Sequence, residues 1–314
     1  MSSVQEQSRD MVLVTGAAGF IGRHVAHALT EAGFGVRKLL EPASGSNEAL
    51  NALSSDEAYG DICDRALLAR LASGVDIVVH LAGSPSVSES FENAAECARV
   101  HLQGTICVLD ACRKAGVRRL IYMSSAEVYG RPETDYVAET HALNARSPYA
   151  AAKIGAEAMM SAYSSAFAMD VIIVRPFSVY GPGASPHALL CEALATTARG
   201  EEVKVRNLRP VRDYIFVSDV ADAVVKACSI EPAAHLLVFN LGTMRGTSVA
   251  DLCRLVLAAF DRPGQAIEEG EQRPGASEIY RLVSDNRCAQ EGLGWTPRTS
   301  LEQGIHQMAE VYKR

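Results

Sequence analysis

The chain has 314 residues, 48% of them hydrophobic, and a formal net charge of −7 at pH 7. This size suits one large α/β domain, or a nucleotide-binding domain with a smaller companion. The acidic balance, without a basic stripe, argues against nucleic acid as a partner, and no apolar run reaches the length of a membrane span.

Residues 1–10 are polar and lack an apolar core segment, so we expect a disordered tail rather than a signal peptide. The eight cysteines show no C-x-x-C spacing, and the eight histidines show no ligand spacing, so no metal site is expected. Free cysteines fit a reducing compartment, and we expect a cytoplasmic protein.

A buried strand is predicted at residues 11–15, followed at once by a glycine-rich segment and a helix at residues 21–32. The segment reads Gly16-Ala17-Ala18-Gly19-Phe20-Ile21-Gly22. Glycines let the backbone approach a ligand closely, and a helix N-terminus offers unpaired N–H groups. This order of strand, turn and helix is typical of a dinucleotide pyrophosphate site.

Strands and helices then alternate. We predict strands at 36–40, 58–62, 76–82 and 119–123, a short helix at 65–72 and a long helix at 91–115. The alternation indicates a doubly wound parallel sheet of the Rossmann type, with helices on both faces. Ligands of such sheets bind at the carboxyl ends of the strands, where residues 80–83, Ser124 and Ser125 arrive.

A helix is predicted from Ser147, with Pro148 in its first turn. Tyr149 and Lys153 are four residues apart and share one face of it. A nearby ammonium favours the phenolate, so we expect Lys153 to lower the pKa of Tyr149 and make it a general base. The Ser125 hydroxyl is expected to share a proton with Tyr149 and to hold a substrate oxygen.

Beyond residue 175 the alternation loosens. We predict a loop at 181–186, helices at 187–199 and at 218–229 with Ser218 as N-cap, a strand at 236–241, and a helix opened by Ser248 and Asp251. The loosening marks the end of the dinucleotide-binding domain at 11–175 and the start of a second part at 176–314.

Seven motifs carry a resemblance that runs from about residue 12 to about residue 304. They are T-G-A-A-G-F-I-G, H-L-A-G, S-S-A-E-V-Y-G, S-P-Y-A-A-A-K, R-P-F-S-V-Y-G-P-G, V-R-D-Y-I-F-V-S-D-V-A-D-A and L-G-W-T-P-R-T-S-L. The chain resembles the extended short-chain dehydrogenase/reductase family, whose members include NAD-dependent nucleotide-sugar epimerases, such as UDP-glucose 4-epimerase, and dehydratases. The resemblance implies that residues 176–314 form a smaller, mainly substrate-binding lobe, interleaved with the first domain, parts of which return to the large sheet. It also implies a homodimer built through the helices around 91–115 and 147–167.

The resemblance also implies a cofactor site for NAD. NADP stays open, because Leu40 occupies the usual acidic position, Glu41 lies beside it, and Arg37 and Lys38 precede it as candidates for a 2′-phosphate. The implied cofactor residues are Gly16, Gly19, Phe20, Ile21, Gly22, Glu41, Asp61, Ile62, Leu81, Ala82, Gly83, His101, Tyr149, Lys153 and Pro176.

The implied substrate is a nucleotide-diphosphate sugar, with Arg212 and Arg273 matching family arginines that hold the diphosphate. Two further positions depart from the family pattern, since His101 and Ser178 each replace an asparagine. The implied substrate residues are Ser86, Ser125, Tyr149, Phe177, Ser178, Arg212, Arg273 and Tyr280.

The family's shared first step is oxidation of a sugar hydroxyl, usually at C4, with Tyr149 taking the proton. A 4-epimerase needs no further acid or base, which suits Ala126. A 4,6-dehydratase of this family has Asp-Glu where this chain has Ala126-Glu127, so a dehydratase or decarboxylase using Glu127 is an alternative. An NADPH-dependent ketosugar reductase and a non-catalytic dinucleotide-binding protein stay open. The candidate catalytic residues are Ser125, Tyr149, Lys153 and Glu127.

Overall fold

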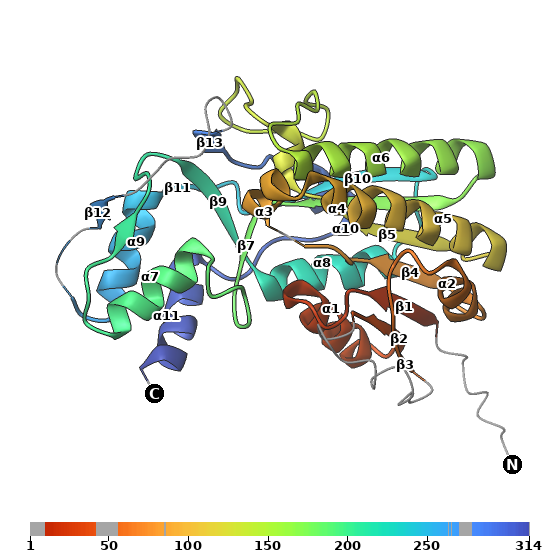
Figure 1. The fold of residues 1–314 in the computed structure, drawn as a ribbon, viewed down its shortest axis with the longest axis horizontal. Helices are drawn as coiled ribbons and strands as arrows, with labels where there is room; N and C mark the ends of the chain where they lie inside the picture. The colour runs from red at the N-terminus through yellow and green to blue at the C-terminus, as the bar shows by residue number, and fades with distance from the viewer. Residues whose placement is uncertain are drawn as a thin grey trace, which may run out of the picture.

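The computed structural model describes residues 10–41, 56–84, 86–262, 264, 266–269 and 278–313. Its centre is a seven-stranded sheet in which all neighbours run parallel, in the order β10-β6-β5-β4-β1-β2-β3 (Figure 1). The strand order reverses between β1 and β4, which is where doubly wound sheets bind ligands. The strands are β1 (Met11–Thr15), β2 (Gly35–Leu40), β3 (Glu57–Tyr59), β4 (Ile77–His80), β5 (Arg119–Met123), β6 (Asp170–Pro176) and β10 (Leu236–Leu241). The predicted fold class is confirmed.

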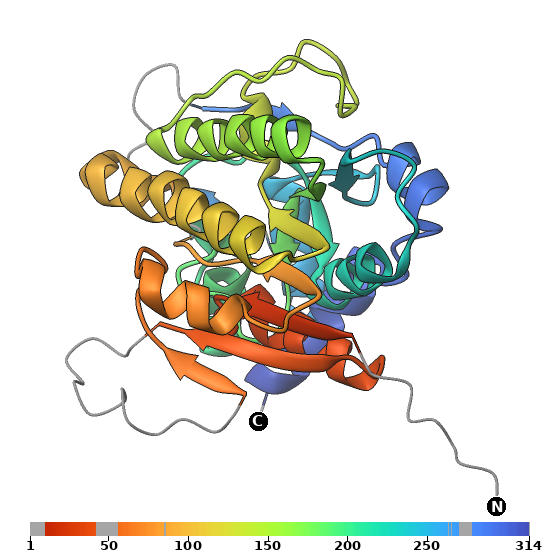
Figure 2. The ribbon, with the colours of Figure 1, turned by 90° about the vertical axis from the view of Figure 1, so that its right-hand side faces the viewer.

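Helices cover both faces of this sheet (Figure 2). Strand residues point alternately to the two faces, so Val12 and Val14 pack into one core and Leu13 into the other. The first core contains α1 (Phe20–Glu31), α8 (Val217–Ser229) and α10 (Arg287–Leu293). The second contains α2 (Arg65–Ala72), α5 (Gly104–Ala115) and α6 (Pro148–Phe167).

The long helix predicted at 91–115 is wrong as a continuous element. The chain forms α3 (Val87–Glu92), α4 (Ala94–Ala98), a π-helical turn η2 (Arg99–Gln103) and then α5. Asn93 separates the first two helices and caps α4, its side chain accepting from the Glu96 N–H at 3.2 Å. At the π turn the Thr105 hydroxyl donates to the His101 carbonyl at 2.6 Å, which supplies a partner where the regular helical ladder is interrupted.

The second lobe holds a four-stranded sheet in which β9 (Val211–Phe216) pairs with β11 (Gly246–Ser248), β13 (Arg281–Leu282) and β7 (Ser178–Tyr180). Its core packs α7 (Leu189–Ala198), α9 (Val249–Ala259) and α11 (Leu301–Tyr312). A two-stranded parallel sheet joins β8 (Lys204–Val205) to β12 (Ile267–Glu268). Segments that follow residue 176 also return to the large sheet, as β10, α8 and α10.

One predicted cap is correct and another is wrong. Ser248 caps α9, its side chain accepting from the Asp251 N–H at 3.0 Å. Ser218 lies inside α8, which begins at Val217 with Phe216 as N-cap and no side-chain cap. Strand β9 ends at Phe216, so the chain passes from strand to helix without a linker in which a capping serine could lie.

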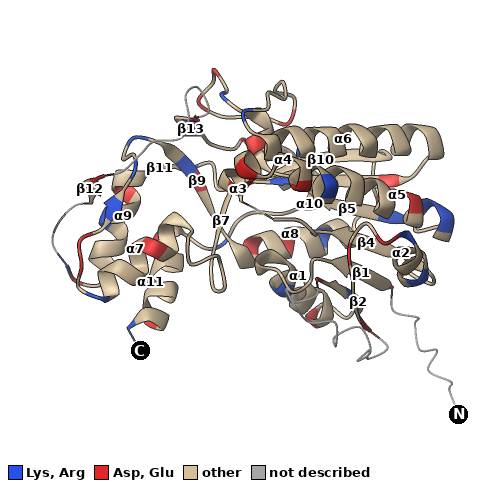
Figure 3. Cartoon of the chain, viewed as in Figure 1, with Lys and Arg blue, Asp and Glu red and all other residues tan. Residues whose placement is uncertain are grey.

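Both signs of charge are spread over the helices and loops (Figure 3). Among the described residues, no helix combines the length and apolar character that crossing a bilayer requires. The same residues contain no group of three or more His, Cys, Asp or Glu side chains arranged to hold a metal ion.

Candidate active site

A cavity of about 690 Å³ opens at the carboxyl ends of β1, β4 and β5 and extends to β7, β9 and β13 of the second lobe. Most residues predicted for the site line it, which brings the glycine segment and the Tyr149–Lys153 pair to one place. The predicted residues that line it are Gly16, Gly19, Phe20, Ile21, Gly22, Glu41, Leu81, Gly83, His101, Ser125, Glu127, Tyr149, Lys153, Pro176, Phe177, Ser178 and Arg212.

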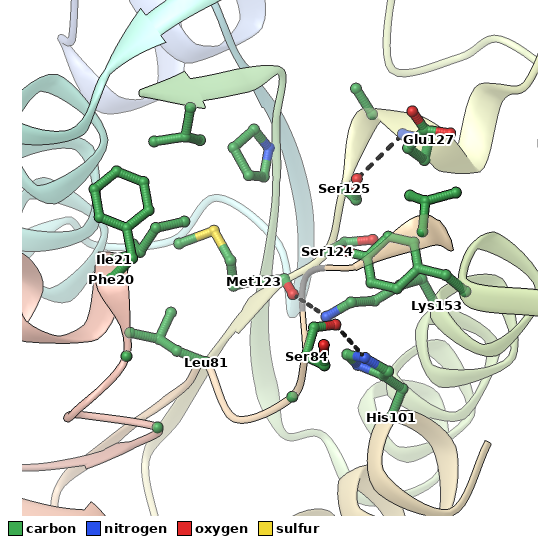
Figure 4. Close-up of a pocket in the computed structure, with 18 of the residues that line it drawn as sticks. Phe20, Ile21, Leu81, Ser84, His101, Met123, Ser124, Ser125, Glu127 and Lys153 are labelled. Carbon is green, nitrogen blue, oxygen red and sulfur yellow. Dashed lines mark hydrogen bonds between the residues drawn. The ribbon is translucent and has the colours of Figure 1, made fainter. Parts of the chain in front are cut away.

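The glycine segment can take no larger side chain at two of its positions. Gly16 has φ +71°, and a Cβ there would lie 2.8 Å from the backbone of Ala82. A Cβ on Gly22 would lie 2.0 Å from the Gly16 carbonyl oxygen. Helix α1 starts at the N-cap Gly19 without a side-chain cap, so its first N–H groups are available to an anion. Phe20 and Ile21 line the adjoining wall (Figure 4).

Tyr149 and Lys153 lie in the first turns of α6, whose N-cap Ser147 accepts from the Ala150 N–H at 3.1 Å. Both side chains are buried. The Lys153 ammonium donates to the Met123 carbonyl at 2.7 Å (Figure 4) and lies 5.8 Å from the centre of the Tyr149 ring. This hydrogen bond ties α6 to the end of β5, next to Ser125.

The expected effect of Lys153 on the pKa of Tyr149 is contradicted. Burial raises the pKa of Tyr149 to about 12, the Ser125 hydroxyl opposes this by hydrogen bonding, and the charge of Glu127 adds to the rise. Burial also lowers the pKa of Lys153 to about 7, against the opposing charge of Glu157. Desolvation penalises the charged form of both groups, and it outweighs the attraction expected from their spacing.

His101 packs edge-on against Tyr149, with ring centres 5.2 Å apart. Its Nε2 lies 2.9 Å from the Ser84 carbonyl (Figure 4), and since a carbonyl only accepts, Nε2 carries the hydrogen. Burial, and then the charge of Lys153, lower the pKa of His101 to about 3, so the ring is neutral. Gly83, with φ +139°, allows this packing, because a Cβ there would lie 2.2 Å from the ring.

Three residues predicted for the cofactor lie outside the cavity lining. Asp61 follows β3 and pairs with Arg99 at 2.9 Å. Ile62 is buried in the core that contains α2 and α5, and Ala82 packs against that core beneath Gly16. Their cofactor roles stay predictions.

Two described residues predicted for the substrate, Ser86 and Tyr280, are not in the lining either. Ser86 is the N-cap of α3 and accepts from the Glu89 N–H at 3.2 Å. Tyr280 is half exposed, with the Arg131 guanidinium 5.9 Å from its ring centre. Arg273 lies outside the described residues.

The two cations considered for a 2′-phosphate are engaged elsewhere. Arg37 donates to the carbonyls of Leu71 and Ser73, at 2.5 and 2.9 Å. Lys38 pairs with Glu57 on β3 at 2.9 Å. Only Glu41, of the side chains considered for this position, lines the cavity. A carboxylate there accepts from a ribose hydroxyl and repels a phosphate.

The second lobe brings a cation to the cavity. Arg212 on β9 lines it, lies 3.6 Å from Glu278 and donates to the Val211 carbonyl at 3.1 Å. The next residue, Asp213, is fully buried, and its carboxylate accepts from the Thr243 and Ser284 hydroxyls at 2.6 Å each. These bonds fix the strand that presents the guanidinium.

Several lining residues were not among the predicted site residues. Ser124 could have been predicted, because it follows directly after a predicted strand. No sequence pattern predicted that Val179 and Leu282 of the second lobe would line the cavity. The additional lining residues are Ala18, Ser84, Val87, Met123, Ser124, Ala126, Val179 and Leu282.

Comparisons with known proteins agree with this geometry. The model of the NAD-dependent epimerase/dehydratase family matches residues 12–242. The chain is 34% identical to the UDP-glucose 4-epimerase of Mycolicibacterium smegmatis, over 96% of this chain and 98% of the relative.

Two solved structures are similar over nearly the whole chain. One is the UDP-glucose 4-epimerase of Thermotoga maritima with UDP-glucose, at TM-score 0.85 and 29% identity, covering 96% of this chain and 98% of that one. The other is the dTDP-glucose 4,6-dehydratase of Streptomyces venezuelae with NAD bound, at TM-score 0.85 and 25% identity, covering 96% and 97%.

Proposed function

Because the chain belongs to the NAD-dependent epimerase/dehydratase family, we propose that it is a nucleotide-sugar 4-epimerase that works by transient oxidation at C4. One observation carries the proposal: Ser125, Tyr149 and Lys153 line the same cavity as the glycine segment of α1. Ala126 follows Ser125 in that lining and cannot donate a proton, which suits a reaction that needs no second acid.

The described residues fit NAD as the cofactor. The glycine segment and the uncapped start of α1 would hold its diphosphate, and Glu41 would accept from a ribose hydroxyl. When bound, NAD supplies a hydride acceptor that also returns the hydride. The engagement of Arg37 and Lys38 by other partners supports NAD over NADP.

In the proposed reaction Tyr149 first releases its phenolic proton to solvent, and the Lys153 ammonium stabilises the resulting phenolate. The phenolate oxygen then takes the proton of the C4 hydroxyl as the C4 hydride leaves, which gives a 4-ketosugar and a neutral phenol, while Ser125 holds the C4 oxygen. The ketosugar turns over, the hydride returns to the other face of C4, and Tyr149 gives the proton back. Atoms and electrons therefore balance without a second substrate.

The proposed substrate is a uridine-diphosphate sugar, as in the epimerases to which the chain is similar. Arg212 would pair with the diphosphate, and Phe177 and Ser178 would contact the ligand from the second lobe. Arg273 stays a proposed second phosphate contact.

The test is incubation with UDP-, dTDP-, GDP- and CDP-sugars in D₂O, followed by NMR of the products. We expect one pair of C4 epimers to interconvert with no deuterium at C5 and no net consumption of cofactor. Deuterium at C5, with loss of water, would refute the epimerase. Stoichiometric consumption of NADPH would indicate the ketosugar reductase instead.

Glu127 favours a second candidate, a dehydratase or decarboxylase, because its carboxylate lines the same cavity beside Ser125, whose hydroxyl accepts from the Glu127 N–H at 3.2 Å. Glu127→Gln separates the two functions. An epimerase is expected to keep most of its turnover, whereas an eliminating enzyme loses its acid–base group and with it about 10²-fold or more in kcat.

A dinucleotide-binding protein without chemistry is tested by Tyr149→Phe. The epimerase is expected to lose about 10²- to 10⁴-fold in kcat. Tyr180→Phe is the matched control, because it removes a buried phenol of the second lobe that bonds only to main-chain carbonyls of the α11 start. Unchanged biological function in Tyr149→Phe would support the non-catalytic protein.

We also propose a homodimer, as in the family the sequence resembles. Phe91 on α3 and Phe167 on α6 lie in the two segments expected to form the dimer and are exposed by 42% and 51%, which supports an apolar contact there. Sedimentation equilibrium would give twice the chain mass for a dimer and the chain mass for a monomer.

A further inference from the structure

Glu157 lies on α6 one helical turn beyond Lys153, which itself lies one turn beyond Tyr149. The three side chains therefore share a face of the helix. Glu157 is 5% exposed and is not among the residues that line the cavity. A carboxylate this deeply buried needs strong partners to keep its charge.

Its partners lie at the ends of two central strands. Arg175 on β6 grips both carboxylate oxygens, its Nε donating at 3.0 Å and its Nη2 at 2.6 Å. The Ser124 hydroxyl donates to the same carboxylate at 2.5 Å, and Ser124 lines the cavity beside Ser125. This bidentate pair with an added hydroxyl fixes the Glu157 side chain behind the active site.

Among the described residues, the titratable groups that interact with Lys153, apart from Glu157, are neutral at working pH. Burial lowers the pKa of both histidines to about 3, and it raises the pKa of the thiol and of both phenols above their ordinary values. Glu157 therefore supplies the one full negative charge among these groups, with Arg175 behind it. The neutral groups are His80, Cys97, His101, Tyr122 and Tyr149.

We propose that Glu157 is a positioning residue that keeps Lys153 protonated and so sustains proton transfer at Tyr149. The part concerning Tyr149 rests on the proposed function. Lys153 has one neutral hydrogen-bond partner, the Met123 carbonyl, and a buried ammonium with only such a partner loses its proton readily. A neutral amine would no longer stabilise the phenolate.

The test measures Lys153 directly. In protein labelled with ¹³C at the lysine Cε, the NMR titration of Lys153 is expected to move to lower pH by about one unit in Glu157→Gln. The alkaline limb of kcat moves down with it, because the active form needs the ammonium. Glu157→Asp keeps the charge and is expected to restore both profiles.

Tyr129→Phe is the matched control. Its hydroxyl accepts from Arg175 at 2.8 Å and donates to Asn240 at 2.7 Å, so it belongs to the same buried network while the charge of Glu157 stays in place. We expect a small loss of stability and an unchanged Lys153 titration.

Titration of Lys153 at the wild-type pH in folded Glu157→Gln would overturn the inference. If that variant does not fold, Glu157→Gln combined with Arg175→Gln removes both charges of the pair, and the titration is still expected to move to lower pH. A shifted titration in a protein that turns over no nucleotide sugar supports this role of Glu157 and counts against the proposed function.

Discussion

Gly16 and Gly74 adopt almost the same left-handed conformation, with φ of +71° and +68°, but of the two only Gly16 is packed closely against other backbone atoms. A Cβ at Gly16 would meet the Ala82 backbone at 2.8 Å, whereas a Cβ at Gly74 would meet nothing within 4 Å. The two positions therefore separate the strain of the conformation from the crowding of the site.

Gly16→Ala and Gly74→Ala are each expected to lose about 1–2 kcal/mol of stability from the unfavourable backbone conformation. Only Gly16→Ala also forces β1 and the segment after β4 apart, so we expect it to bind NAD at least tenfold more weakly. Thermal unfolding and titration calorimetry with NAD check this. Equal NAD affinity in the two variants would contradict the expectation.

The motif residues of the site could be predicted because their chemistry restricts the residue type. Close backbone approach selects glycine at Gly16 and Gly22, and a shared helix face needs the four-residue spacing of Tyr149 and Lys153. The protonation of that pair could not be predicted, because burial sets it and burial is a property of the packed molecule. Val179 and Leu282 reach the cavity only through strand pairing in the second lobe.

At the scale of elements, we expect the N-terminus of α6 to couple stability to the proposed catalysis. Ser147 caps α6 two residues before Tyr149, and Ser300 caps α11 in the second lobe through a capping box. Replacing either cap with alanine removes a similar hydrogen bond, but only Ser147 supports the turn that carries the phenol.

Ser147→Ala and Ser300→Ala are each expected to destabilise the protein by about 1 kcal/mol. Ser147→Ala should also lower kcat several-fold, because fraying of the first turn of α6 displaces Tyr149 from Ser125. Ser300→Ala should leave kcat unchanged. Urea unfolding and steady-state kinetics measure the two effects, and identical kcat values in the pair would argue against the coupling.

Element boundaries were predictable where local signals and packing agree. Residues 65–72 form the predicted short helix, with Asp64 as its N-cap. The predicted long helix is interrupted at two places. The break at Asn93 is a local cap, whereas the π turn depends on a long-range contact. The Thr105 hydroxyl, which donates to the His101 carbonyl, lies 3.1 Å from the ring of His80 on β4. No helical periodicity records that contact.

For the whole molecule, the two buried histidines contribute to the dependence of stability on pH below about 6.5. Burial lowers the pKa of His80 and of His101 to about 3, from 6.5 in the unfolded chain. Below pH 6.5 the two histidines are therefore protonated in the unfolded chain but stay neutral in the native protein. The stability that the two neutral rings contribute is fully present above that pH and is lost as the pH falls toward 3.

We expect each ring to cost about 2 kcal/mol of stability between pH 7 and pH 5. His101→Asn, which can still donate to the Ser84 carbonyl, should remove about half of the combined loss from the two rings. Urea unfolding of the wild type and the variant at pH 7, 6 and 5 provides the comparison. A variant as pH-sensitive as the wild type would show that His101 is not a source of the effect.

The alternation of elements predicted the doubly wound sheet, since hydrophobic runs of strand length separated by amphipathic helices admit few other arrangements. The return of the chain to that sheet was implied only by the resemblance to the family. The course of the second lobe was less predictable. Its four-stranded sheet joins short strands from segments far apart in the sequence, and such strands carry little pattern of their own.

The place of β10 at the end of the large sheet bears on how the protein is made. Its partner β6 ends at Pro176, and β10 spans Leu236–Leu241. While a ribosome synthesises the intervening segment, the edge of β6 that includes the apolar residues Val171 and Ile173 has no neighbouring strand to pair with. Until β10 emerges, the unpaired edge of β6 can pair wrongly with other chains. A holdase chaperone bound to that edge would protect it during translation.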